Sequence, residues 1–191
     1  MRILKIALLL ASIFMLAGVA IVAYSTTATE ATIQAYQEKV ENIGRQTPSL
    51  VYDPNTAQQL PSPVASYFQF TFGDVSQAVN FVNMKMAGQF RRPQTESFAA
   101  TTAAQTVAVG TPALVFAATT PIVPGVWARA YDAFVAGRME MKAKILSTLT
   151  VVDERATPAL DQTSLRRWLL ESPLYPAALL PGGPVTLGAN R

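Results

Sequence analysis

Apolar and polar residues alternate along the middle of the chain, which is typical of β-strands with one buried face. Between residues 79 and 90, Val82, Met84 and Met86 alternate with Asn83 and Lys85. Successive side chains of a strand point to opposite faces, so this run predicts a strand with one apolar side. Similar runs occupy residues 97–109, 113–119, 126–135 and 139–145. Gly and Pro separate these runs by short turns, which predicts a mostly antiparallel, meandering sheet.

Apolar residues with the spacing of a helix precede this sheet. Ile33, Tyr36, Val40 and Ile43 recur at intervals of three or four residues, and Gly44 provides a stop. We therefore expect an amphipathic helix whose apolar stripe packs against the domain.

Two shorter helices are expected further along the chain. Residues 62–70 begin with Ser-Pro, which is typical of a helix start. A second helix is expected over residues 164–172, capped by Asp161 or Thr163 and ended by a proline. The apolar stripe of this second helix consists of Leu165, Trp168 and Leu169.

The N-terminal segment Ile6–Tyr24 is a run of 19 residues without a charge. As a helix it spans roughly 28 Å, close to the hydrocarbon thickness of a bilayer. Arg2 and Lys5 precede it, whereas the first charge after it is Glu30. The positive-inside rule therefore predicts a single-pass protein of the cytoplasmic membrane, with its N-terminus inside and its domain on the periplasmic or extracellular face.

A cleaved signal peptide is the alternative explanation of this segment, because Thr26 and Ala28 are small residues at a possible processing site. Both explanations export the rest of the chain. We expect three parts: an anchor or signal over residues 1–25, a helix and linker over 26–59, and a sheet domain over 60–191.

The composition restricts the chemistry that the chain can perform. There is no Cys and no His in 191 residues, which excludes disulfides and thiolate metal sites and removes the commonest general base. The sequence also has no phosphate-binding glycine loop, no nucleophile elbow and no metal-ligand spacing. We therefore expect no enzyme, no catalytic residue, no cofactor and no metal site.

The net charge of +3 does not indicate a nucleic-acid partner. Arg2 and Lys5 account for two of the 15 basic residues, so the rest of the chain carries 13 basic against 12 acidic residues. The basic residues alternate with acidic and apolar ones and form no stripe. We expect no nucleic-acid binding.

Two carboxylates are the candidates for a minor, enzymatic hypothesis. Asp132 lies close in sequence to Arg129 and Glu140, and a buried Asp beside an Arg can have a shifted pKa. An ion pair on the sheet is the alternative explanation. Glu171 follows Arg167 by four residues, which favours a pair along a helix.

Methionines are concentrated on the apolar sides of two predicted strands. They are Met84, Met86, Met139 and Met141. Flexible thioethers suit surfaces that accommodate variable apolar ligands. Ordinary core packing is the alternative for each of them.

Four blocks of sequence together resemble one protein family. They are LPSPVASYF (60–68), MKMAGQF (84–90), YDAFVAGRMEMKAKIL (131–146) and LRRWLLESPLYPAALLP (165–181). Their order and spacing are similar to those of an uncharacterised bacterial family of membrane-anchored proteins, a domain of unknown function. The resemblance covers about residues 60–181, and the last block is the most specific.

The resemblance implies an α+β fold, in which the N-terminal transmembrane helix is followed by a curved, mostly antiparallel sheet with short covering helices. It is similar to lipoprotein-carrier half-barrels, whose sheet wraps a helical cover and leaves a gap that can hold acyl chains. Fold alone does not fix function. Family members continue past ALLP with further strands, so we expect a chain truncated at its C-terminus, with a partial half-barrel and an open sheet edge.

We therefore expect an uncharacterised protein of the bacterial cell envelope that binds a lipid or another apolar ligand in the half-barrel groove. The residues expected to line this groove are Met84, Met86, Phe116, Met139, Met141, Trp168 and Tyr175. The alternative is a structural or interaction module without a ligand, whose protein partner is unknown.

Overall fold

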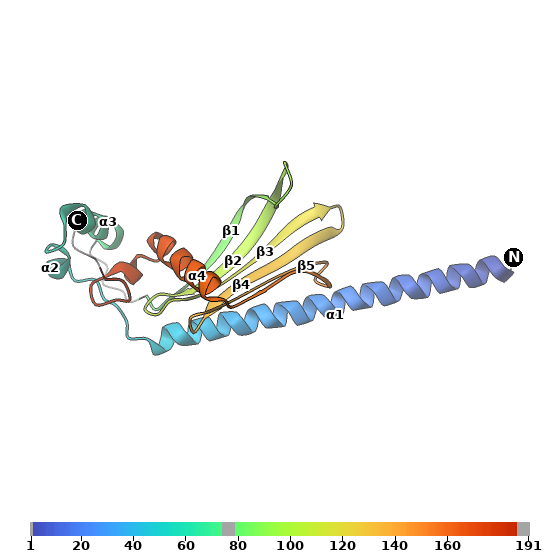
Figure 1. Ribbon diagram of the computed structural model, residues 1–191, viewed down its shortest axis with the longest axis horizontal. Coiled ribbons are helices and arrows are strands. Elements are labelled where there is room, and N and C mark those ends of the chain that lie inside the picture. The colour runs from blue at the N-terminus through green and yellow to red at the C-terminus, as the bar shows by residue number, and fades with distance from the viewer. Residues whose placement is uncertain (1, 74–78, 187–191) are drawn as a thin grey trace.

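A long helix, an antiparallel sheet and a group of short helices make up the computed structural model, which describes residues 2–73 and 79–186 (Figure 1). The helices are α1 (Arg2–Gln46), α2 (Pro54–Ala57), α3 (Ser62–Phe72) and α4 (Pro158–Leu170), followed by the 3-10 turns η1 (Ser172–Leu174) and η2 (Pro176–Leu179). The strands are β1 (Phe81–Arg91), β2 (Phe98–Ala108), β3 (Ala113–Val123), β4 (Val126–Val135), β5 (Arg138–Ile145) and β6 (Leu149–Arg155). The α+β class is confirmed.

The six strands form one sheet in the order β1-β2-β3-β4-β5-β6, and every neighbouring pair is antiparallel. The predicted meander is therefore confirmed. Ala136 and Gly137 both have positive φ, 52° and 74°, as the tight β4–β5 hairpin requires. Strand β6 was not among the predicted strands, because Val151 and Val152 are adjacent and interrupt the alternation.

The sheet has two faces, and different elements cover them. We call one the α1 face; it carries Val115, Ala117, Tyr131 and Ala133, which pack against α1. We call the other the open face; it carries Val107, Leu114, Phe134 and Met139, which pack against the C-terminal helices. Each strand thus supplies side chains to both faces, as the period of two requires.

Helix α1 is continuous from Arg2 to Gln46 and uses its second half to cover the α1 face (Figure 1). Its buried residues are Thr29, Ile33, Val40 and Gly44, with Tyr36 and Ile43 packed beside them. The predicted amphipathic stripe is therefore confirmed. The first half has no buried residue and is long and apolar enough to cross a membrane, a property shared by a membrane anchor and a signal sequence.

Polar contacts tie α1 to the sheet between these apolar residues. Glu30 accepts two hydrogen bonds from Arg129, at 2.7 and 2.8 Å. Tyr36 of α1 and Tyr131 of β4 both donate to the Glu140 carboxylate, at 2.9 and 2.7 Å. Burial, aided by the Glu140 contact, raises the pKa of Tyr36 to about 12. Burial likewise raises the pKa of Tyr131, so both tyrosines stay protonated and keep donating at neutral pH.

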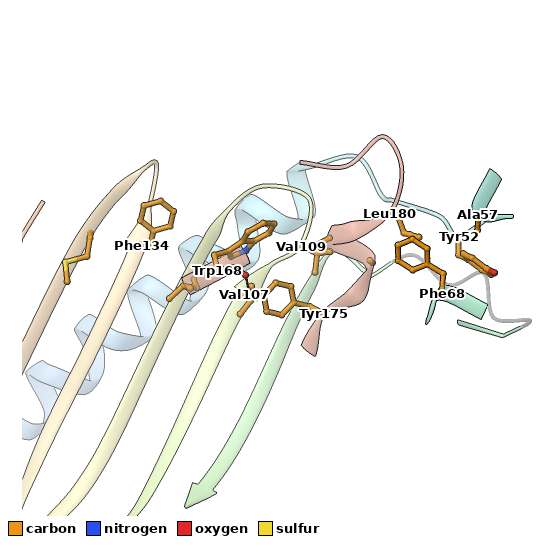
Figure 2. Close-up of a cluster of buried hydrophobic side chains, with 13 residues drawn as sticks. Tyr52, Ala57, Phe68, Val107, Val109, Phe134, Trp168, Tyr175 and Leu180 are labelled. Atoms are coloured by element: carbon orange, nitrogen blue, oxygen red, sulfur yellow. Dashed lines mark hydrogen bonds between the residues drawn. The ribbon is translucent and has the colours of Figure 1, made fainter. Parts of the chain in front are cut away.

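The open face carries the larger part of the core. Figure 2 shows Trp168 and Tyr175 against Val107 and Val109, and the cluster continues through Leu180 to α2 and α3. The Trp168 indole donates to the Ala108 carbonyl at 3.0 Å, and the Tyr175 hydroxyl donates to the Trp168 carbonyl. These two bonds satisfy the polar atoms of two large buried rings.

Two details of the helices differ from the sequence-based expectation. Thr157 caps α4 by accepting from the Leu160 amide, so the helix begins before Asp161 and Thr163, and Asp161 instead accepts from the Met139 amide. Leu165 and Leu169 are 44% exposed, so Trp168 is the member of the predicted apolar stripe that is buried. The sequence pattern was misleading here because the leucines flank the contact and do not form it.

The segment expected to be a linker contributes to the core. Asp53 caps the short α2, and the side chains of Tyr52 and Ala57 are buried. Tyr52 stacks on Phe72 of α3 with ring centroids 5.0 Å apart. The Pro-rich composition that suggested a linker reflects a compact turn; the boundaries proposed at residues 25 and 59 stay a prediction.

Gly44 allows the closest approach between α1 and the sheet, and it offers a test of the packing. A Cβ built there lies 2.6 Å from the Asn80 carbonyl oxygen and 2.9 Å from Phe81 Cβ. We expect Gly44→Ala to lower the free energy of unfolding by about 1–2 kcal/mol, because overpacking outweighs the gain in helix propensity. Gly88→Ala, which meets nothing within 4 Å, is the control. Denaturant unfolding of the full chain in detergent measures both; equal stability of the two variants would contradict the close packing.

Glu140 makes the stability of the α1 contact depend on pH. Burial alone would raise its pKa, but the hydrogen bonds from Tyr131 and Tyr36 and the charge of Lys142 outweigh burial and lower it. The carboxylate therefore stabilises the fold above its ordinary pKa, and this contribution is lost as the pH falls through the lowered value. We expect Glu140→Gln to cost about 1 kcal/mol at pH 7 and less at pH 3. Glu96→Gln, on an exposed turn, is the control; a cost for Glu140→Gln that does not change with pH would reject this account.

Candidate functional site

The residues predicted to line a groove share the open face but differ in their surroundings. The β1 and β5 methionines lie at register positions of one face, and Met84, Gln105, Phe116, Asp132 and Met141 follow one another across five strands. Met139, Trp168 and Tyr175 are 8%, 1% and 1% exposed and pack in the core. The half-buried members are Met84, Met86, Phe116 and Met141.

A network of polar side chains crosses this row where α4 meets the sheet. Arg167 donates to Asp132 at 2.8 Å, to Glu171 at 2.7 Å and to Gln105 at 3.1 Å. Gln105 in turn donates to Glu171 at 2.7 Å. The guanidinium also lies over the Phe116 ring, 4.8 Å from its centroid. The predicted pair of Arg167 and Glu171 is therefore confirmed, within a larger network.

Asp132 pairs with a different arginine from the one that its sequence neighbours suggested. Arg129 and Glu140 lie on the α1 face, where they bind Glu30 and the two tyrosines, whereas Asp132 lies on the open face. An odd spacing along a strand places residues on opposite faces, which excludes the expected contact. Burial raises the pKa of Asp132, and the charge of Arg167 opposes this rise. The carboxylate thus has a partner that explains its position without a reaction.

The open face continues beyond this network as a surface of small side chains. The next register row consists of Met86, Ala103, Ala118, Ala130 and Ala143, and we call its four alanines the alanine floor. All four are half-buried. Thr101 and Thr120 follow on the same face and share a hydrogen bond of 2.9 Å. Along the strands, the side chains of the open face therefore become smaller from the core row at Leu114 and Phe134 to the alanine floor.

Sequence reasoning did not identify the alanine floor. The signal was present, because each alanine occupies the apolar phase of its strand. It was overlooked because alanine is a common core residue, and its significance depends on which neighbour covers it. In Figure 1, α4 lies over the end of the sheet near the β4–β5 turn, and the strands extend well past it.

Arg167 holds the network together, and its removal tests the network's contribution to stability. We expect Arg167→Ala to lower the free energy of unfolding by about 2 kcal/mol, because Asp132, Glu171 and Gln105 lose a shared donor in a partly buried setting. Arg166→Ala, at the exposed neighbouring position, should change it by less than about 0.5 kcal/mol. Chemical denaturation followed by tryptophan fluorescence measures both. Similar costs for the two variants would show that the network contributes little.

Comparisons with known proteins identify a family without an assigned activity. No curated protein matches the chain, and no solved structure matches it. A model of a family of unknown function, DUF6920, matches residues 58–189. This match covers more than half of the chain and includes the sheet, the polar network and the alanine floor. The chain therefore belongs to the family of unknown function DUF6920.

Proposed function

We propose that this protein is a membrane-anchored, non-enzymatic protein of the cell envelope, and that its alanine floor holds an acyl chain or a similar apolar ligand. The observation that carries the proposal is the row Ala103, Ala118, Ala130 and Ala143 on the open face, beyond the area that α4 covers. Neighbouring strands are about 4.8 Å apart, so the row offers an apolar strip about 15 Å long.

The surroundings of the floor favour an apolar ligand. Met86 and Met141 are half-buried at its margins and can adapt to chains of different shape. Small side chains let a chain approach the backbone closely, and burying each methylene group contributes about 0.8 kcal/mol. The polar network at Arg167 occupies the neighbouring register row and borders the floor along one long side, where its charges favour water or a polar headgroup over a methyl terminus.

The first half of α1 supports a proposal on the location of the protein. We propose that the helix is retained as an anchor and that the sheet lies outside the cytoplasmic membrane, because Arg2 and Lys5 precede the apolar segment. Asp132 and Glu171, the two candidate catalytic carboxylates, are both engaged by Arg167, which supports binding over catalysis. Loss of function in Asp132→Asn without loss of folding would instead favour an enzyme.

Filling the alanine floor tests the proposal. We expect Ala118→Trp to reduce uptake of a fluorescent fatty acid about tenfold, because the indole occupies the strip on which the chain lies. Ala100→Trp is the control, since Ala100 is exposed on the other side of β2. Titration of the full chain in detergent measures uptake, and native mass spectrometry after mild extraction detects lipid that copurifies. Absence of lipid together with absence of uptake would reject the proposal.

A protein partner on the same face is the second candidate function. Leu165, Leu169 and Leu170 are 44%, 44% and 79% exposed on α4, beside the floor, and such apolar groups are enriched at contact surfaces. Crosslinking in membranes that yields one discrete partner, with no lipid bound, would favour this function over lipid binding.

A further inference from the structure

The turns β3–β4 and β5–β6 lie beside the apolar half of α1 (Figure 1). An open recess of about 520 Å³ separates them from the helix, and its lining includes Met15, Gly18, Val19 and Val22 of α1 together with Trp127 and Leu146 of the sheet. The lining is almost entirely apolar. The sheet therefore extends along α1 as far as the segment that is apolar enough to cross a membrane.

The position of this recess along α1 can be placed relative to a bilayer. Gly18 precedes Tyr24, the end of the apolar run, by six residues. At 1.5 Å per residue this is roughly 9 Å along the helix axis. The lining of the recess continues through Val22 to Thr26, so the recess extends from the outer half of a span roughly 28 Å long to just beyond its end. The outermost acyl segments and the headgroups occupy this range of depths.

The chemistry of the β3–β4 turn suits that depth. Residues 121–127, PIVPGVW, carry no charge, and Val123 is 56% exposed. Leu149 and Val151 beside the β5–β6 turn are 62% and 52% exposed. Trp127 lies where tryptophan is enriched in membrane proteins, at the boundary between headgroups and acyl chains. An exposed apolar group of this kind next to a spanning helix marks a contact with a membrane.

We propose that the β3–β4 and β5–β6 turns dock onto the outer leaflet of the bilayer that α1 spans, and that acyl chains of this leaflet fill the recess between α1 and Trp127. The occupant follows from continuity, because one wall of the recess is the spanning helix itself. Insertion is shallow, since the backbone groups of the turns need water or headgroups as hydrogen-bond partners. The first paired charge above the turns is Arg129 with Glu30, at the level where the helix leaves the membrane.

This inference rests on the proposed membrane anchor. The alanine floor lies on the same strands as the turns but on the face opposite to α1, and the row of Thr101 and Thr120 lies between the floor and the β3–β4 turn. Docking and ligand binding remain separable, because the turns and the floor are different residues.

The absence of cysteine from the sequence allows a site-specific test. We expect a water-sensitive fluorophore attached to Val123→Cys to emit at shorter wavelength in nanodiscs of phosphatidylcholine and phosphatidylglycerol. Lipids that carry a nitroxide high on the acyl chain should quench it about threefold more than the same label on Ala136→Cys. Ala136 is the matched control, because it is exposed on a hairpin turn at the opposite end of the sheet.

The same samples separate the two proposals. Comigration of the labelled chain with nanodiscs after an alkaline wash reports the anchor, and quenching at position 123 reports the docking. A chain that stays in the nanodisc while both labels are equally open to iodide in water would overturn the docking and leave the anchor intact. A chain that washes off would reject both. Circular dichroism identical to the unmodified chain shows that the variants are folded.

Discussion

Helix α1 combines an apolar first half with a second half that covers the sheet, and the rest of the structure depends on how the sheet packs against this helix. The helix runs without a break from Arg2 to Gln46. The contact between α1 and the sheet consists of the buried side chains of Ile33 and Val40 and a close backbone approach at Gly44. Exposed ion pairs contribute little by comparison. Because the helix is continuous, this docking fixes the position of the sheet along α1 relative to its apolar half.

Side chains alternate between the two faces of each strand, so one sheet packs against α1 on one face and forms the core and the alanine floor on the other. Side chains of one phase hold α1, and those of the other phase form the core under Trp168 and then the alanine floor. The network around Arg167 marks the boundary between core and floor. The Arg167 guanidinium is held over the Phe116 ring because it donates hydrogen bonds both to Glu171 after α4 and to Asp132 on the sheet. The core therefore ends at a defined row.

The sequence predicted the strands and helices better than it predicted the side-chain contacts between them. Alternation located β1 to β5 and the stripe of α1, because these signals are local. Closeness in sequence indicated the wrong partner for Asp132. Its actual partner, Arg167, lies 35 residues away on α4 and reaches Asp132 only because α4 folds back across the sheet. Burial of Tyr52 was missed for the same reason. The methionines did share a face, but Met139 lies in the core, so their common phase did not distinguish packing from binding.

The topology itself supports an orientation of the sheet toward the membrane. In a meander, alternate turns lie at the same end, so the β1–β2, β3–β4 and β5–β6 turns share one end and the β2–β3 and β4–β5 turns the other. The two turns nearest to α1 carry no charge, whereas residues 91–97, RRPQTES, at the distant edge are polar and basic. If α1 spans a bilayer as proposed, the first two turns contact the leaflet and the third faces headgroups or water. The composition of each turn thus matches its distance from the helix.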